Sequence, residues 1–157
     1  MPGSVLAIYA TLHAGEDLLP LATATLEAGR GIVGDRYFEH SGTFSDKLKD
    51  TKDWEVTLIE QEEVERFNTA LGKALGPGSF RRNIVTVGVR LNDLVGHRFK
   101  VGNAVLEGVR LCEPCAYLAT LLGPEVVKAM SHRVGLRARI VAGAKVLPGD
   151  RLIERAA

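Results

Sequence analysis

The sequence shows neither a long hydrophobic run nor the pattern of an N-terminal leader. None of its apolar stretches approaches the roughly 20 residues that a membrane-spanning helix needs, so we expect no membrane partner. The N-terminal segment, MPGSVLAIYATLHAGEDLLP, lacks the basic region, apolar run and small-residue cleavage site of a secretory signal peptide. A cytoplasmic location is therefore the expectation.

Neither sign of charge predominates in the chain. The 20 Lys and Arg residues nearly balance the 19 Asp and Glu residues, which gives a formal net charge of +1. Proteins that bind nucleic acids through their overall field carry a marked basic excess, so we expect no nucleic-acid partner. A site for an anionic ligand must therefore be built locally, from residues that the fold brings together.

Cysteine is scarce, because Cys112 and Cys115, in the stretch RLCEPCAYL, are the only two. Two cysteines are too few for a disulfide framework. In a reducing compartment, such a pair is more often metal-binding or redox-active than a structural disulfide. The pair is therefore a candidate functional motif.

Four interpretations of this pair remain open on local grounds. A zinc site needs four ligands, and the four histidines of the chain are solitary and widely spaced. The C-x-x-C spacing between a predicted strand and an apolar helix favours a thiol redox site, although no βαβ unit precedes it. Alternatively, both side chains are buried and inert, or a single accessible thiolate binds a soft metal.

Glycine, in contrast, is abundant, and its 17 residues divide the chain into short segments. Apolar residues at helical spacing predict a helix over 60–75, ended by Gly76-Pro77-Gly78. A second helical segment covers 116–130, with a break at Gly123-Pro124. Alternating and β-branched patterns predict strands at 4–12, 22–28, 55–60, 80–89, 97–102 and 104–111, and two or three more within 137–154.

These elements define a fold class. The strands do not alternate regularly with helices, which disfavours a parallel doubly wound sheet. About eight short strands with flanking helices favour a largely antiparallel, barrel-like sheet. The polar stretch over 38–54 is expected to be a long surface loop. We expect one domain over residues 1–157, mainly β with flanking helices.

Arginines recur beside the predicted strands. In FRRNIVTVG, Arg81, Arg82 and Asn83 begin a strand, where alternation would point the two arginines to opposite faces. In SHRVGLRARI, Arg133 precedes a strand, and alternation places Arg137 on its polar face. The planar arginine fork suits bidentate recognition of phosphate, although ordinary solvated strand surfaces explain both patterns.

A glycine-rich turn, GRGIVGDRY, adds a third polar element. Gly31 and Gly34 allow close approach of the backbone, and Asp35 and Arg36 form an adjacent pair of opposite charge. Turn chemistry alone accounts for the glycines and the aspartate. Convergence of this turn, the arginine-bearing strands and the cysteine pair would create a pocket for an anionic ligand that tolerates sulfur.

Taken in chain order, these motifs resemble the MOSC family, named after the C-terminal domain of molybdenum cofactor sulfurase. The resemblance covers most of residues 29–152. Its elements are GRGIVGDRY, VTLIEQEEVERF, FRRNIVTVGVRLNDLVGHRFKVGNAVLEGVRLCEPC and RVGLRARIVAGAKVLPGDRL. The central block is the specific part, because it combines Arg-Arg-Asn-Ile with a strand that leads to Pro-Cys. The resemblance implies a β-barrel-like fold that binds a pterin-bound molybdenum cofactor.

The resemblance also implies site residues. The family's metal-binding or sulfur-carrying cysteine matches Cys115, which follows Pro114, whereas Cys112 stands where members vary. Cys115 would thus be both the catalytic residue and the molybdenum ligand. The implied cofactor-binding residues are Arg82 and Asn83 in the strand motif, Arg36, Arg133 and Arg137 at the pterin phosphate, and Gly31, Gly34 and Asp35 in the loop over the cofactor.

An activity follows from the same resemblance. Stand-alone members reduce small N-hydroxylated substrates, such as hydroxylated purine analogues and amidoximes, with electrons from a separate reductase. The alternatives are a domain that carries the cofactor, or persulfide sulfur on Cys115, without turnover, and a C-x-x-C thiol redox protein. The chain has no room for the desulfurase domain of the larger sulfurases, so pyridoxal phosphate is not expected on it. FEHSGTFSDKLKD replaces the histidine-glycine-rich segment of several members, which leaves substrate specificity undetermined.

Overall fold

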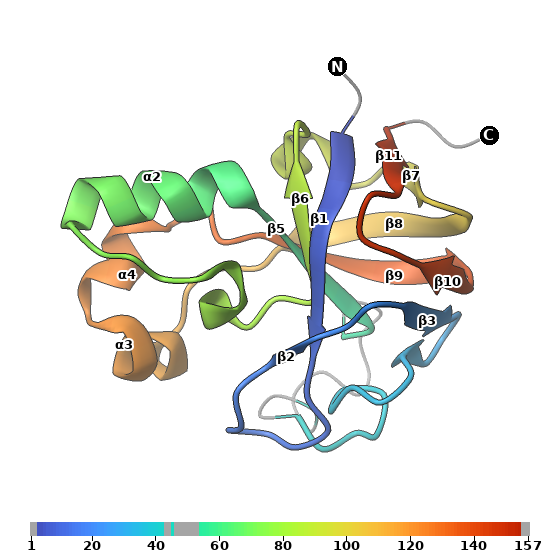
Figure 1. Ribbon diagram of the computed structural model, residues 1–157, viewed down its shortest axis with the longest axis horizontal. Helices are drawn as coiled ribbons and strands as arrows, with labels where there is room; N and C mark the ends of the chain where they lie inside the picture. Colours follow the sequence, from blue (N-terminus) through green and yellow to red (C-terminus); the bar gives the residue numbers. More distant parts are fainter. Residues whose placement is uncertain (1–2, 43–44, 46–53, 155–157) are drawn as a thin grey trace.

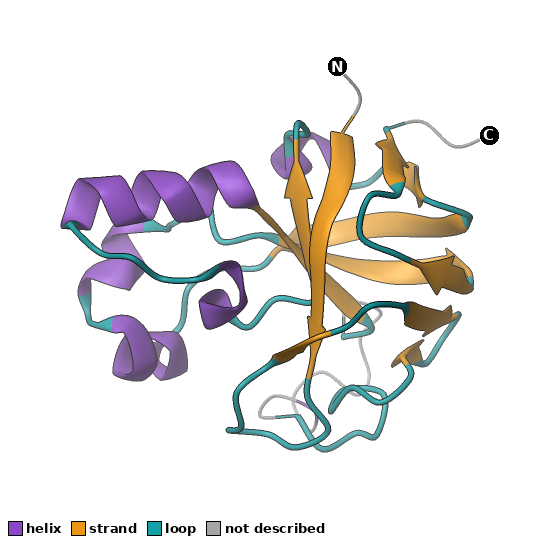
Figure 2. Ribbon diagram, in the orientation of Figure 1, coloured by secondary structure: helices purple, strands orange, loops and turns teal. Residues whose placement is uncertain are grey.

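The computed structural model describes residues 3–42, 45 and 54–154. Its strands gather on one side of the molecule and its helices on the other (Figures 1 and 2). The helices of this described part are α2 (Gln61–Leu71), α3 (Ala116–Leu122) and α4 (Glu125–Ala129), with short 3-10 helices η1 (Pro77–Phe80) and η2 (Leu91–Leu94). The strands are β1 (Gly3–Ala10), β2 (Leu19–Pro20), β3 (Ala24–Glu27), β4 (Gly31–Ile32), β5 (Val56–Glu60), β6 (Ile84–Val87), β7 (Arg98–Val101), β8 (Ala104–Leu111), β9 (Leu136–Ala142), β10 (Ala144–Val146) and β11 (Arg151–Ile153).

The main sheet closes on itself. Its strand order is β11-β7-β8-β9-β5-β6-β1-β2, and an additional pairing of β1 with β11 joins the ends of a barrel. The pairings are antiparallel except for β5 with β6, which are parallel and are connected through α2, as parallel neighbours require a crossover. A small sheet, β10-β3-β4, lies beside the barrel. The expected mainly β, barrel-like fold with flanking helices is confirmed.

Two hydrophobic cores hold this arrangement together. One fills the barrel, with Phe99, Leu106 and Ile140 among its buried side chains. The other lies between the barrel and the helices, where the rings of Phe67 and Phe80 meet edge to face with centroids 5.4 Å apart. Because β5 faces both cores, all five of its residues are buried. This is why the segment is nearly continuously apolar rather than alternating.

The first helix ends earlier than the sequence pattern predicts. The helix α2 stops at Gly72, which adopts a left-handed conformation with φ of 62° and donates its N–H to the Asn68 carbonyl. The Asn68 side chain then holds the following segment by accepting from the Leu75 N–H at 3.0 Å and donating to the Leu75 carbonyl at 2.9 Å. The expected end at Gly76-Pro77-Gly78 was wrong, because Gly72 and this asparagine already terminate the helix.

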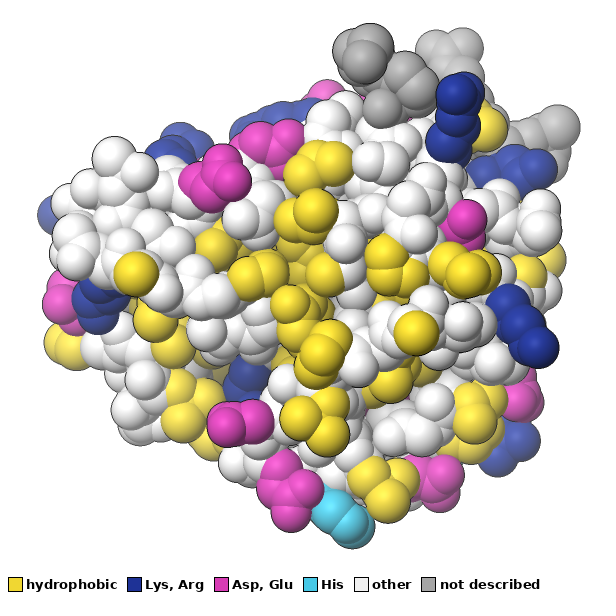
Figure 3. All heavy atoms as spheres, in the orientation of Figure 1, with side chains coloured by type: hydrophobic (Ala, Val, Ile, Leu, Met, Phe, Trp, Pro, Cys, Tyr) yellow, Lys and Arg dark blue, Asp and Glu magenta, His cyan; other side chains and the backbone are white. Residues whose placement is uncertain are grey.

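Two further features follow from the arrangement of the strands. The described residues form eleven strands rather than about eight, since several pairings involve only two or three residues. Hydrophobic side chains gather on the face that β1 crosses (Figure 3), and Leu6 of β1 and Leu19 of β2 are among the exposed ones. Among the described residues, no helix is long and apolar enough to cross a membrane. The expected loop over 38–54 lies largely outside the described residues.

Candidate functional site

A cavity opens where five segments of the chain meet beside the barrel. It contains about 430 Å³ of empty space, counted with its open mouth. The walls come from the turn after β4, from β5, from the segment before β6, from the start of α3 and from β9. The described residues that line it are Arg36, Tyr37, Thr57, Arg81, Arg82, Cys115, Tyr117, Leu118 and Arg137. We refer to Arg36, Arg81, Arg82 and Arg137 as the cavity arginines.

Cys115 brings a thiol to this cavity. It is half-buried and immediately precedes α3, and its Sγ accepts from the Leu118 N–H at 3.5 Å. Leu118 is packed in the second core, so this contact fixes the sulfur relative to a rigid part of the molecule. A free thiol held in this way at a cavity wall is available to a ligand.

Cys112 has a different environment. It is 1% exposed, and its backbone N–H donates to the Gly135 carbonyl at 2.8 Å, next to the start of β9. Both cysteines are free thiols, but only Cys115 belongs to the described wall of the cavity. The structure thus places the two residues of the C-x-x-C motif in unequal positions, and the role expected of Cys115 stays a prediction.

Asp35 and Arg36 form the pair that the turn sequence suggests. The Arg36 Nη1 lies 3.2 Å from the Asp35 Oδ1, and both side chains are buried. Burial lowers the pKa of Arg36 from its ordinary value, whereas the charge of Asp35 opposes that change. The Asp35 carboxylate also accepts from the Tyr37 N–H at 3.2 Å. Asp35 therefore holds the turn and lies behind Arg36 rather than in the described cavity wall.

Asn83 joins this turn to the barrel. Its Oδ1 accepts from the Thr57 N–H at 3.1 Å, and its Nδ2 donates to the Tyr9 carbonyl at 3.1 Å and to the Asp35 Oδ1 at 3.4 Å. One buried amide thus connects β1, β5 and the turn after β4. Asn83 is not among the described lining residues, so the geometry gives it a positioning role for Asp35 and Arg36.

Arg81 and Arg82 both line the cavity, which differs from the expectation of opposite faces. The strand β6 begins only at Ile84, and Arg81 ends η1 in a left-handed conformation with φ of 62°. Strand alternation therefore does not apply at this position. The Arg82 Nε donates to the Val134 carbonyl at 2.9 Å, and the Arg81 Nη1 donates to the Glu16 carbonyl at 2.6 Å. Both guanidinium groups are anchored by backbone oxygens, and neither has an ion pair with a carboxylate in the described ranges.

Arg137 completes the group from β9, where alternation places it correctly on the polar face of the strand. Its side chain has no ion pair or hydrogen bond with any residue that the structure describes. The Arg81 Nη2 is likewise buried and has no partner within the described ranges. Of the four cavity arginines, only Arg36 pairs with a carboxylate of the described residues, that of Asp35, and the described lining contains no acidic side chain. The cavity therefore carries a local excess of positive charge, although the chain as a whole is nearly neutral.

Besides Asp35 and Asn83, three other residues expected at the site lie outside the described cavity wall. Arg133 is 45% exposed in its side chain and pairs with Glu63, its Nη1 lying 3.3 Å from the Glu63 Oε2. Gly31 and Gly34 are not in the described cavity wall. A Cβ at Gly31 would lie 2.8 Å from the Glu55 carbonyl oxygen, so this glycine allows two backbones to approach. Gly34 has φ of 86° and lets the turn deliver Asp35 and Arg36.

Sequence reasoning missed several wall residues. Only one of Arg81 and Arg82 was expected to face a cleft, and Tyr37, Thr57 and Tyr117 were not singled out. Tyr37 and Tyr117 stand directly after the motifs GDR and CEPCA, so adjacency to those motifs could have found them. The zinc interpretation gains no support, because no three His, Cys, Asp or Glu side chains come together as a metal site in the part of the chain that the structure describes.

These residues fit an anionic metal cofactor. A phosphate group needs charged donors, and the cavity arginines supply them, three of which have no ion pair with a carboxylate of the described residues. The Arg81 Nη2 is buried and has no partner in the described part of the chain, which indicates a wall built to receive an acceptor. The accessible Cys115 sulfur is a soft ligand of the kind that suits a soft transition metal. Fold and site together define a β-barrel protein with an electropositive, thiol-bearing cavity.

The family comparison agrees with this description. The model of the MOSC domain matches residues 39–153, and the chain belongs to that family. MOSC domains are generally associated with binding of the molybdenum cofactor. No curated protein matches the chain in sequence.

Solved structures show the same fold. The YuaD protein of Bacillus subtilis superposes with a TM-score of 0.80 at 16% identity, over 97% of this chain and 94% of the other. YiiM of Geobacillus stearothermophilus gives a TM-score of 0.73 at 18% identity, over 97% of this chain and 74% of the other. YiiM of Escherichia coli gives 0.68 at 17% identity, over 98% and 69%. At these identities the likeness concerns the fold.

Proposed function

We propose that this protein binds the pterin-bound molybdenum cofactor in the cavity and reduces small N-hydroxylated compounds with electrons from a separate reductase. The observation that carries the proposal is the conjunction of one accessible thiol with four arginines that have, among the described residues, a single paired carboxylate, Asp35. The family's association with the molybdenum cofactor gives that conjunction a chemical meaning. Neither feature alone would identify the ligand.

The roles of the residues follow from their positions. The Cys115 thiolate would hold molybdenum, and the contact from the Leu118 N–H keeps its sulfur oriented. Arg36, Arg82 and Arg137 would hold the pterin phosphate, each from a different segment of the wall. Asp35 and Asn83 would keep Arg36 in place. When bound, the cofactor supplies two electrons that, with two protons, convert an N–OH group to N–H and release water.

The proposal is tested by loading and turnover. The protein is produced in a host that makes the molybdenum cofactor, and bound molybdenum is measured per chain. The loaded protein is then assayed with hydroxylamine and an aromatic amidoxime, using a reductase as the electron donor. We expect about one molybdenum per chain and reduction of both compounds.

The other outcomes separate the alternatives. Molybdenum without turnover would favour a domain that carries the cofactor and contradict the reductase. Absence of molybdenum, in a host that loads another MOSC protein, would contradict both and favour thiol redox chemistry. That chemistry would require Cys112, which is now 1% exposed, to become accessible.

A further inference from the structure

The outer face of the barrel carries basic side chains beside the cavity. Along β9, buried and half-buried residues alternate, which places Arg137 and Arg139 together on the outward face. The same alternation along β7 places Arg98 and Lys100 outward. We refer to Arg98, Lys100, Arg137 and Arg139 as the basic strip.

The register of the strands leaves this strip with an excess of positive charge. The strand β8 lies between β7 and β9, and its Glu107 is the cross-strand partner of both Arg98 and Arg139. The Arg98 Nε lies 3.2 Å from the Glu107 Oε2, and the Arg139 Nε lies 2.9 Å from the Glu107 Oε1. One carboxylate thus serves two guanidinium groups. Glu107 is also the only acidic residue of β7, β8 and β9.

The basic strip is continuous with the cavity. Arg137 belongs to both, and its cross-strand partner on β5, Thr57, also lines the cavity. The spacings of residues along a strand and of strands in a sheet put Arg137 and Lys100 about 15–20 Å apart. An interface of standard size covers about 800 Å² on each partner, which is enough to extend from one to the other. A protein docked on the strip would therefore reach the wall of the cavity.

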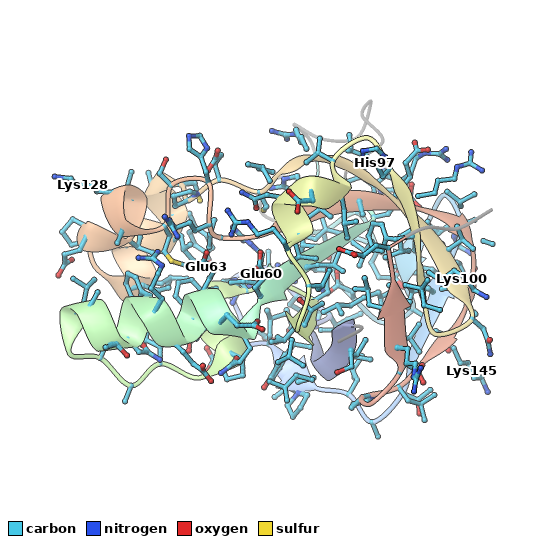
Figure 4. All side chains as sticks on the ribbon, turned by 90° about the horizontal axis from the view of Figure 1, so that it is seen from above. Glu60, Glu63, His97, Lys100, Lys128 and Lys145 are labelled. Carbon is cyan, nitrogen blue, oxygen red and sulfur yellow. The ribbon has the colours of Figure 1, made fainter. Side chains whose placement is uncertain are left out.

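The outer end of the strip combines a charge with apolar surface. Lys100 has no ion pair or hydrogen bond with any residue that the structure describes. Its cross-strand neighbours are Val105 on β8 and Ile153 on β11, and Ile153 is 47% exposed. Figure 4 shows Lys100 at the end of the molecule opposite to the helices. Basic side chains beside exposed apolar ones suit a protein partner, because such an interface also buries apolar surface.

We infer that the basic strip is the docking surface for the electron-donor protein, and that this donor carries an acidic surface around its redox group. This inference rests on the proposed function, which requires electrons from a separate reductase. Complementary charges speed the association of two proteins and orient them before contact, which suits a partner that binds and leaves in each turnover. Because Arg137 connects the strip with the cavity, a donor docked there lies beside the cavity that contains Cys115.

Lys100→Glu offers a clean way to disturb the strip. It reverses one charge at an outward position that has no ion pair in the described ranges, so the fold should be retained. The matched control is Lys128→Glu, which makes the same change at an exposed position on α4, at the opposite end of the molecule (Figure 4). Both variants have the same net charge. A difference between them therefore reports the place of the charge.

Two measurements test the inference, with flavodoxin, a small acidic flavin protein, as the probe. In the metal-free protein at low ionic strength, Lys100→Glu should weaken binding of flavodoxin, measured by calorimetry, about 10-fold. The difference should disappear at about 1 M salt, where charges are screened over about 3 Å. In the loaded protein, with reduced flavodoxin as the donor, Lys100→Glu should raise KM for flavodoxin about 10-fold and change KM for benzamidoxime less than about twofold. Lys128→Glu should match wild type in both. If Lys100→Glu does not fold, Arg98→Gln, whose position is half exposed, should weaken flavodoxin binding instead.

The outcomes distinguish the docking surface from the proposed activity. Flavodoxin binding that Lys100→Glu weakens, without turnover in wild type, would support the surface and contradict the reductase. Turnover in wild type, with the same KM for flavodoxin in Lys100→Glu and Lys128→Glu, would overturn the surface alone. Failure of wild type to bind flavodoxin at low ionic strength would overturn it as well. So would an oligonucleotide that binds wild type more tightly than flavodoxin does and loses that affinity in Lys100→Glu.

Discussion

Two groups of arginines in this protein differ in how their charge is compensated. Around Glu63, at the start of α2, the side chains of Arg66, Arg90 and Arg133 all reach one carboxylate, with N···O distances of 2.6, 3.5 and 3.3 Å. Glu60 and Glu63 lie close together where β5 passes into α2 (Figure 4). Among the described residues, the cavity arginines have one ion pair, that of Arg36 with Asp35. The first group is an ion-pair network, and the second has charge left for a ligand.

The comparison shows that a count of arginines does not identify an anion site. Each group contains an arginine from SHRVGLRARI, residues 131–140. Arg133 belongs to the group around Glu63, and Arg137 belongs to the cavity arginines. The distinguishing property is the number of carboxylates and backbone oxygens that the fold places beside each guanidinium group. We therefore expect substitutions in the two groups to separate, the cavity affecting ligand retention and the Glu63 group affecting stability.

The largest expected effect concerns the thiol in the cavity. Cys115→Ala should reduce bound molybdenum to below about one tenth of the wild-type content, because the sulfur ligand is lost. Cys112→Ala is the matched control and should retain most of the metal, since Cys112 lies outside the described wall. Metal analysis of the purified variants checks this. Equal losses in both would indicate a site with two thiolates.

The second-largest expected effect is on retention of the pterin cofactor, and it should differ between arginines of the two groups. Arg82→Ala or Arg137→Ala should weaken retention of the pterin cofactor about 10- to 100-fold, the loss expected for a hydrogen bond to a charged group. Arg133→Ala should leave retention unchanged, because its partner is Glu63. Pterin released from each variant is quantified by fluorescence. A loss in Arg133→Ala as large as that in Arg137→Ala would contradict the separation of the groups.

Substitutions in the group around Glu63 should change the stability of the protein. Glu63→Ala should lower the free energy of unfolding by about 1–3 kcal/mol, because it leaves three arginines without their shared acceptor. The arginine side chains are 38–50% exposed, so water compensates part of the loss. Denaturant unfolding measures the change. Glu65→Ala, at an exposed position on the same helix, is the control and should have a much smaller effect.

The smallest effect concerns Glu60. Burial raises its pKa above the ordinary value of 4.5, although the Leu91 N–H and the charge of Arg90 act against this. The folded state therefore binds this proton more tightly than the unfolded chain, and stability falls as pH rises from 4.5 through the raised pKa. Glu60→Gln should remove this fall and change stability at pH 7 by less than about 1 kcal/mol, because the amide oxygen can still accept from Leu91. A pH series of unfolding curves checks it, and an unchanged slope would contradict it.

The sequence predicted those parts of the molecule that depend on local patterns. The face of α2 that bears Val64 and Phe67 follows from their spacing, and both side chains are buried in the second core. The break at Gly123-Pro124 was also predicted correctly, since α3 ends at Leu122 and α4 begins at Glu125. In each case neighbouring residues determine the structure, so a pattern of a few residues suffices.

The remainder depends on contacts between distant segments. Arg133 and Arg137 are four residues apart, yet of these two only Arg133 pairs with Glu63 of α2. Arg81 joined the cavity because η1 ends in a left-handed residue before β6, and strand periodicity gives no sign of this. Asn83 was expected at the cofactor, whereas its hydrogen bonds to Thr57, Tyr9 and Asp35 lie behind the wall. Partners that are 26 to 74 residues away in the chain decided these positions.

The most direct test of the comparison is an anomalous-scattering map, at the molybdenum edge, of crystals of the loaded wild-type protein. We expect one molybdenum peak bonded to the Cys115 sulfur, with the pterin phosphate hydrogen-bonded to Arg36, Arg82 and Arg137. A peak at Cys112, or a phosphate held by the arginines around Glu63, would contradict it.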